Sequence, residues 1–225
     1  MFRSLAPLSA ALITGVAAIG LTLRGGATAP VAVTVPAPLA GNELTPAAAP
    51  DTAVFAGGCF WGIEAVFEHV KGVQSAVSGY TGGTTASPSY EDVSTGTTGH
   101  AESVRVVYDP AVVSYGQLLQ VFFSVAHDPT QLNRQGPDHG TQYRSAIFYR
   151  TKEQQRAAES YVRQLTAAKT FDRPIVTQIV PLGAFYPAES YHQHYMANHP
   201  DQPYIVYNDA PKVAHLKEQF PQLYQ

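Results

Sequence analysis

Hydrophobic and polar residues alternate between strand-like and helical patterns from about residue 51 to the C-terminus. Runs rich in β-branched and aromatic residues predict strands at 52–56, 73–80, 103–108, 144–150 and 175–182. Apolar residues three and four apart predict helices at 60–70, 114–127, 151–169 and 211–224, with a short helix within 188–198. This order predicts an α+β fold, a two-layer sandwich with a ferredoxin-like βαββαβ core and additional C-terminal helices.

The first 50 residues differ in composition from the rest of the chain. Residues 1–24 begin with a short positive region around Arg3 and continue as an uncharged apolar run, which is typical of a signal peptide or an N-terminal membrane anchor. Residues 25–50 are rich in Ala and Pro and predict an extended, unpacked linker. We therefore expect an exported protein, periplasmic or membrane-anchored facing the periplasm, whose catalytic domain covers 51–225.

Charge and cysteine content exclude several classes of function. The net charge is only −3 and no basic block occurs, so nothing indicates binding to nucleic acid. The chain has a single cysteine among 225 residues, which excludes an intramolecular disulfide and a cysteine-rich metal site.

That cysteine lies in the most distinctive stretch of the chain, Gly-Gly-Cys-Phe-Trp-Gly at 57–62, which also holds the only tryptophan. The stretch joins a predicted strand to a predicted helix. Free N–H groups and the positive end of the helix dipole gather at such a position and favour the thiolate of Cys59. A buried structural cysteine is the alternative, because free cysteine is among the most buried residue types.

Two long polar loops, 81–100 and 128–142, contain the other candidate groups. Loops of this length in a compact domain are usually functional or disordered. Four short blocks in and around these segments, together with the cysteine stretch, carry a resemblance to a known family. They read Gly-Tyr-Thr-Gly-Gly at 79–83, Thr-Gly-His-Ala-Glu at 98–102, Asp-His-Gly-Thr-Gln-Tyr-Arg at 138–144 and Tyr-His-Gln-His-Tyr at 191–195. Over residues 52–225 the chain resembles the A-type peptide methionine sulfoxide reductases.

The resemblance implies the central chemistry. Cys59 is the nucleophile that attacks the sulfoxide sulfur, and Glu102 protonates the sulfoxide oxygen. Glu102 can do so near neutral pH only if a dry environment or like charges raise its pKa. Tyr90 and Tyr143 are expected to donate hydrogen bonds to the same oxygen.

The resemblance also implies how the substrate is recognised. Phe60 and Trp61 form an apolar wall for the S-methyl group, and Asp138 is a polar orienting group. Opposed subsites for oxygen and methyl select one sulfoxide epimer, and the resemblance implies the S epimer. The implied function is repair of oxidised methionine, in proteins and as the free amino acid.

The chain departs from the family where many members carry recycling cysteines. In the stretch 199–205, Pro203 and Ile205 stand where Gly and Cys occur in those members. The sulfenic acid formed on Cys59 therefore requires an external thiol, from a thioredoxin-like protein or a small thiol such as glutathione. We expect no cofactor and a monomeric enzyme.

Three other interpretations stay open at this point. A cysteine hydrolase could use Cys59 with His100, His127 or His139 as the base. A non-catalytic module could bind oxidised peptides. A metal site at His192, His194 and His199 is not favoured, because residues two apart do not share a helix face.

Overall fold

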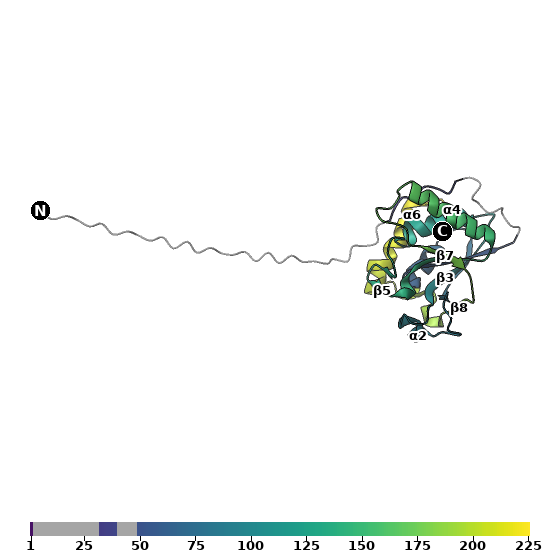
Figure 1. Ribbon diagram of the computed structural model, residues 1–225, viewed down its shortest axis with the longest axis horizontal. Coiled ribbons are helices and arrows are strands. Elements are labelled where there is room, and N and C mark those ends of the chain that lie inside the picture. The colour runs from purple at the N-terminus through teal and green to yellow at the C-terminus, as the bar shows by residue number, and fades with distance from the viewer. Residues whose placement is uncertain (2–31, 40–48) are drawn as a thin grey trace.

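The computed structural model describes residues 32–39 and 49–225, together with Met1, and the predicted signal peptide or anchor lies outside this part apart from Met1. The strands are β1 (Asp51–Gly57), β2 (Val73–Thr81), β3 (Ala101–Tyr108), β4 (Arg134–Gln135), β5 (Asp138–His139), β6 (Ser145–Tyr149), β7 (Gln178–Pro181) and β8 (Tyr186–Pro187). The α-helices are α1 (Phe60–Glu68), α2 (Tyr90–Ser94), α3 (Tyr115–Val121), α4 (Lys152–Ala167), α5 (Tyr195–Asn198) and α6 (Ala210–Gln219). Short 3-10 or π-helical turns are η1 (Phe122–Ala126), η2 (Thr141–Tyr143), η3 (Ser190–His192) and η4 (Ile205–Asp209). The ribbon in Figure 1 labels the helices α2, α4 and α6 among these elements.

One six-stranded sheet, in the order β7-β6-β1-β3-β2-β8, organises the molecule. Strand β1 pairs antiparallel with both β3 and β6, and β2 pairs antiparallel with β3. These four strands have the order expected for the predicted ferredoxin-like core, and β7 extends it by pairing parallel to β6. The predicted α+β class is confirmed.

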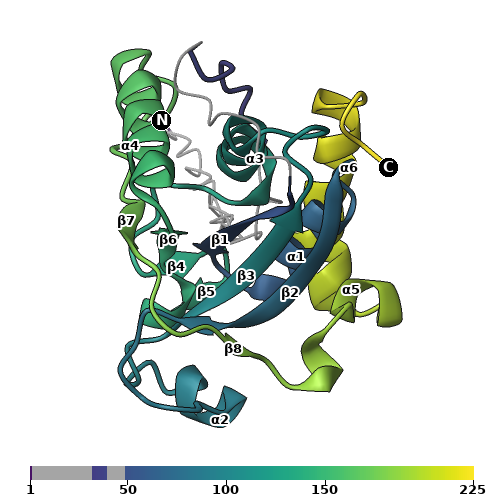
Figure 2. The ribbon, with the colours of Figure 1, turned by 90° about the vertical axis from the view of Figure 1, so that its right-hand side faces the viewer.

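The two faces of the sheet carry hydrophobic clusters of different size. Along β1, Phe55 joins the main core, whereas Val54 joins a smaller cluster on the opposite face, because successive strand side chains alternate. In the main core, Phe55 stacks on Phe67 of α1 and on Phe122, with ring centroids 5.1 and 4.9 Å apart. Helices α1 and α6 lie side by side along one face of the sheet (Figure 2).

Local sequence signals placed the helix starts correctly. Ser114 forms the predicted capping box with Gln117 at the start of α3, and the Thr151 hydroxyl accepts from the Gln154 N–H at the start of α4. Within the first predicted loop, however, Ser89 and its capping box begin the short helix α2. No helix in the described residues is both long and apolar enough to serve as a membrane span.

Part of the predicted linker packs against the domain. The Val33 N–H donates to the Ser124 carbonyl at 3.0 Å, and the Val35 side chain is buried. The Tyr161 hydroxyl of α4 donates to the Pro36 carbonyl at 2.6 Å. The expectation of an unpacked segment is therefore wrong for residues 32–39. Extended Pro-rich backbone leaves its carbonyls free, and polar side chains of the neighbouring helices bind them.

Candidate active site

Cys59 occupies the turn between β1 and α1, at the N-cap position of the helix. Gly58 precedes it with φ +101°, a conformation that favours glycine, and a Cβ there would lie 2.5 Å from the Cβ of Gln135. A Cβ on Gly57 would lie 2.8 Å from Cγ of His127. The two glycines therefore let neighbouring segments close tightly around the turn, and the cysteine is 8% exposed.

Glu102 reaches this turn from the first residues of β3. Because β1 and β3 are antiparallel, with Phe55 opposite Val104, the start of β3 lies beside the end of β1. The Oε2 atom of Glu102 accepts a hydrogen bond of 3.1 Å from the Phe60 N–H. Burial raises the pKa of Glu102 to about 8, although the Phe60 N–H opposes this shift. Glu102 therefore keeps its proton near neutral pH.

The expectation that Cys59 is a ready thiolate is wrong for the resting enzyme. Burial, then the negative charges of Glu102 and Asp209, raise the pKa of Cys59 well above its ordinary value. The backbone N–H of Trp61 lowers this pKa by hydrogen bonding to the cysteine, but this effect does not outweigh those that raise it. Since Glu102 is itself mostly protonated near pH 7, burial is the dominant cause, and the resting group is a thiol.

Tyr90 and Tyr143 approach Glu102 from two separate segments. Tyr90 is the first residue of α2, and its N–H donates to Oε1 of Glu189 at 2.9 Å; Oε2 of Glu189 accepts from Tyr80 on β2. Tyr143 ends the turn η2 and is also half-buried. Burial and then the nearby Glu102 carboxyl raise the pKa of both phenols, so both remain hydrogen-bond donors.

Asp138 faces a partner that the sequence analysis did not identify. The Tyr204 hydroxyl donates to Oδ2 of Asp138, which is half-buried in the strand β5. Burial raises the pKa of Asp138, whereas this bond and the Lys212 ammonium lower it. Tyr204 is the residue before Ile205, in the segment where many family members carry a cysteine that this chain lacks.

Phe60 and Trp61 lie in different surroundings. Phe60 is only 1% exposed and belongs to the main core. Trp61 is half-buried and stacks on Tyr195, with ring centroids 3.7 Å apart and an interplanar angle of 7°. Its Nε1–H donates to Nδ1 of His192 at 3.1 Å, and it meets the ring of Tyr204 edge-on. Of the two predicted wall residues, Trp61 is therefore the one with surface left for a substrate.

Two of the three histidines available to a cysteine hydrolase are committed elsewhere. His127 contacts the Phe122 carbonyl at 3.0 Å through Nδ1 and the Ser145 hydroxyl at 2.7 Å through Nε2, and burial lowers its pKa to about 4. His100 contacts the Gly83 N–H through Nδ1 and a backbone carbonyl through Nε2. Neither ring is free to take a proton from Cys59, and His139 is exposed.

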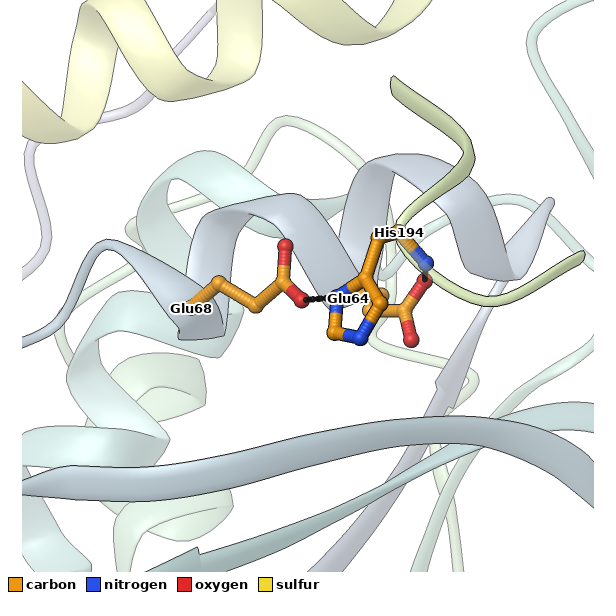
Figure 3. A group of neighbouring side chains, drawn as sticks. All are labelled: Glu64, Glu68 and His194. Carbon is orange, nitrogen blue, oxygen red and sulfur yellow. Dashed lines mark hydrogen bonds and ion pairs between the residues drawn. The ribbon is translucent and has the colours of Figure 1, made fainter. Parts of the chain in front are cut away.

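A different histidine joins two glutamates that could hold a metal ion. One ligand atom each of Glu64, Glu68 and His194 lie within 4.8 Å of one another (Figure 3). Both Glu64 oxygens already accept backbone hydrogen bonds, from Ser78 at 3.3 Å and from His194 at 3.0 Å. The His194 ring bonds Glu68 directly. The cluster therefore acts as a clamp that fastens residues 193–195 to α1, and His192 lies apart from it, against Trp61.

Comparison with known proteins places the whole described domain in one family. The family described as "Peptide methionine sulfoxide reductase" matches residues 51–224. "Peptide methionine sulfoxide reductase MsrA 2" of Mesorhizobium japonicum is 63% identical over 174 residues, which is 77% of this chain and 89% of that relative. "Peptide methionine sulfoxide reductase MsrA" of Deinococcus radiodurans is 53% identical over 175 residues, covering 78% and 84% of the two chains.

Solved structures agree with this placement. Methionine sulfoxide reductase A of Corynebacterium diphtheriae aligns with a TM-score of 0.58 and 38% identity, covering 76% of this chain and 85% of that one. Reduced Mxr1 of Saccharomyces cerevisiae aligns with a TM-score of 0.63 and 31% identity, covering 73% and 94%.

Proposed function

Because the chain belongs to the peptide methionine sulfoxide reductase family, we propose that Cys59 is its nucleophile and Glu102 its proton donor. As a member of the A type, the protein is an oxidoreductase that reduces methionine sulfoxide and so repairs oxidised protein. The observation that carries the assignment is the bond between Glu102 and the Phe60 N–H, next to a thiol at a helix start. This bond joins a protonated acid to the backbone N–H of the residue that follows the nucleophile.

In the proposed step, oxygen passes from methionine sulfoxide to Cys59. The cysteine sulfur attacks the sulfoxide sulfur and forms an S–S bond while Glu102 gives a proton to the oxygen. The hydroxyl group then passes from the methionine sulfur to the Cys59 sulfur as the S–S bond and the methionine S–O bond break. Glu102 then takes up the proton that the thiol releases, so the acid is unchanged at the end. The products are the methionine thioether and a sulfenic acid on Cys59, and the sum of atoms and electrons is conserved.

The surrounding groups suit the other requirements of this step. The hydroxyls of Tyr90 and Tyr143 donate to the oxygen as negative charge develops, and the Asp138–Tyr204 pair orients the polar side of the substrate. The face of Trp61 takes the methyl group. Separate sites for oxygen and methyl select the S epimer, both in proteins and in free methionine sulfoxide.

We further propose that an outside thiol completes the cycle, because the chain has no second cysteine. Two thiols from a thioredoxin-like protein, or two molecules of a small thiol such as glutathione, reduce the sulfenic acid. They yield the Cys59 thiol, one disulfide and one water. The scheme uses no cofactor and needs only one chain.

Location is a separate proposal that rests on residues outside the described part. The apolar N-terminal segment 1–24 directs export, so that the enzyme works in the periplasm, released or anchored.

The proposed function is tested by supplying separated S and R epimers of methionine sulfoxide with dithiothreitol. Wild-type protein is expected to reduce the S epimer, and Cys59→Ser to reduce neither. A dimedone adduct on Cys59 after substrate addition without reductant would identify the sulfenic acid. Retained reduction by Cys59→Ser would refute the assignment, and cleavage of an ester or peptide without loss of reductant would favour the hydrolase instead.

A further inference from the structure

A buried ion pair lies beneath the proposed active site. Nζ of Lys212 is 3.0 Å from Oδ1 of Asp209, and the two side chains are 6% and 0% exposed. Among the buried residues of the described chain, Lys212 is the only lysine or arginine. Removing two charges from water costs free energy that their attraction often fails to recover, so stability alone is a weak reason for such a pair.

The pair packs directly against the turn that carries the nucleophile. Gly62 belongs to the first turn of α1, three residues after Cys59. A Cβ on Gly62 would lie 2.1 Å from Oδ1 of Asp209 and 2.8 Å from Nζ of Lys212. The absence of a side chain at Gly62 therefore brings both charges against the helix backbone.

The Asp209 carboxylate is also incompletely satisfied. Its Oδ2 atom is buried and has no hydrogen-bond partner in the described residues. A carboxylate with one oxygen that accepts no hydrogen bond interacts strongly with nearby charged and titratable groups in a region of low dielectric. Accordingly, Asp209 contributes to raising the pKa of both Cys59 and Glu102, while Lys212 lowers that of Asp138.

We propose that Asp209 and Lys212 are positioning residues of the active site, which fix the first turn of α1 and hold Cys59 and Glu102 in their uncharged forms before substrate binds. For its catalytic consequence this inference rests on the proposed function. The pair reaches the site from the C-terminal segment, where η4 passes into α6, in the same stretch as Tyr204 and Ile205.

The other ionisable groups near the thiol do not replace this pair. They come from β3, β5, α2, η2 and the residue before η4, and they are acidic or phenolic: Glu102, Asp138, Tyr90, Tyr143 and Tyr204. Asp209 differs from these groups because it forms a direct ion pair with a buried cation, Lys212. Burial raises the pKa of Asp209, whereas the ion pair with Lys212 lowers it and favours the charged carboxylate.

The test uses the fact that Cys59 is the only cysteine, so alkylation of the whole protein reports on this thiol alone. In Asp209→Asn, loss of the negative charge is expected to lower the pKa of Cys59 and to speed alkylation by iodoacetamide at neutral pH, about tenfold for each unit of pKa. The decline of kcat/KM at high pH is expected to move to lower pH. The matched control is Asp201→Asn, an exposed position in the same segment, and it should change neither.

A second variant guards against misfolding caused by an unpaired lysine. Asp209→Asn/Lys212→Met removes both charges, and replacing a buried ion pair by neutral groups is often tolerated. It should speed alkylation in the same direction. If melting temperatures fall in both variants while alkylation rates and pH profiles match wild type, the pair is only structural and the proposal is overturned. Since alkylation needs no substrate, this result is independent of whether Cys59 reduces sulfoxides.

Discussion

The Oε2 atom of Glu102 accepts a hydrogen bond of 3.1 Å from the backbone N–H of Phe60, the residue that follows Cys59. The bond joins β3 to the first residue of α1, so the carboxyl group and the thiol are held by adjacent backbone. Glu102 is 2% exposed, and its raised pKa follows mainly from that burial. The hydrogen bond thus places the proposed acid, and burial keeps it protonated although the bond itself lowers its pKa.

Replacing Glu102 by glutamine should remove the acid and leave its position intact. The amide oxygen of Glu102→Gln can still accept from the Phe60 N–H, but an amide cannot supply the proton. We expect kcat/KM for the S epimer to fall about 10²- to 10⁴-fold, the usual contribution of general acid catalysis. Glu91→Gln, at an exposed position on α2, is the control. Activity within about threefold of wild type would assign the proton to another group.

The pH dependence of the reaction should report the same carboxyl group. Because the pKa of Glu102 is raised, its protonated form is present at neutral pH and is lost as the pH rises through about 8. We therefore expect kcat/KM to decline above about pH 8, measured with a reductant whose own ionisation has been corrected for. In Glu102→Gln this decline should be absent. A decline already complete at mildly acidic pH would contradict a Glu102 that is protonated at neutral pH.

Gly62 should resist the substitution that ordinarily stabilises a helix. Alanine in a helix interior is favoured over glycine by roughly 0.5–1 kcal/mol. At Gly62, however, the added Cβ would lie 2.1 Å from Oδ1 of Asp209, and overpacking of this kind costs about 1–3 kcal/mol. We expect a net loss of stability for Gly62→Ala in urea unfolding. Gly183→Ala, where no atom lies within 4 Å of the new Cβ, is the control. A Gly62→Ala protein as stable as wild type would show that the ion pair moves freely.

His192 should control the orientation of Trp61. In His192→Phe the ring packing is kept, but the acceptor for Trp61 Nε1–H is lost. A hydrogen bond of about 1 kcal/mol corresponds to about a fivefold change, and we expect it mainly in KM because Trp61 is proposed to contact the substrate. In a double-mutant cycle with Trp61→Phe, the two effects should be non-additive. Full additivity would mean that the bond does not position the indole.

Glu64 should make the stability of the fold depend on pH. Burial raises its pKa to about 7, with the Glu68 carboxylate as the next cause, so the folded state favours the protonated form. The resulting stability is fully present below the ordinary glutamate pKa and is lost as the pH rises through about 7. The fold is therefore destabilised towards alkaline pH by the buried charge, although the backbone hydrogen bond from His194 that Glu64 accepts in the clamp favours the ionised form (Figure 3).

Glu64→Gln removes this titration, and its free energy of unfolding should vary less between about pH 4.5 and about pH 8. Over this pH range, the change in the free energy of unfolding should differ between the two proteins by at most about 3 kcal/mol, since each unit of pKa corresponds to about 1.4 kcal/mol. Urea denaturation at several pH values measures it. Parallel pH profiles for the two proteins would show that Glu64 titrates normally.

Local sequence chemistry was sufficient for much of the fold. The capping signals at Ser114 and Thr151 begin their helices, and the hydrophobic patterns place the main strands. Such signals act over a few residues, so a linear reading can find them. Cys59 was found from its position at a predicted helix start, whereas Glu102 and Asp138 were assigned through short blocks that resemble those of a known family.

Contacts between distant segments could not be found in this way. The docking of residues 32–39 and the bonds of Tyr204 and His192 join parts of the chain that have no common pattern. In sequence, the spacing of Asp209 and Lys212 is that of an ordinary exposed ion pair on a helix. The pair is buried only because α6 packs on α1 in the folded chain.

The sequence by itself determined the order of the elements, the single thiol at a helix start and the family of the enzyme. Only the tertiary structure decided the protonation state of that thiol. A helix N-terminus favours the thiolate through nearby N–H groups, which are local. Burial and the carboxyl groups of Glu102 and Asp209 oppose it, and these come from segments far away in sequence. Because desolvation outweighs the local hydrogen bond, Cys59 rests as a thiol.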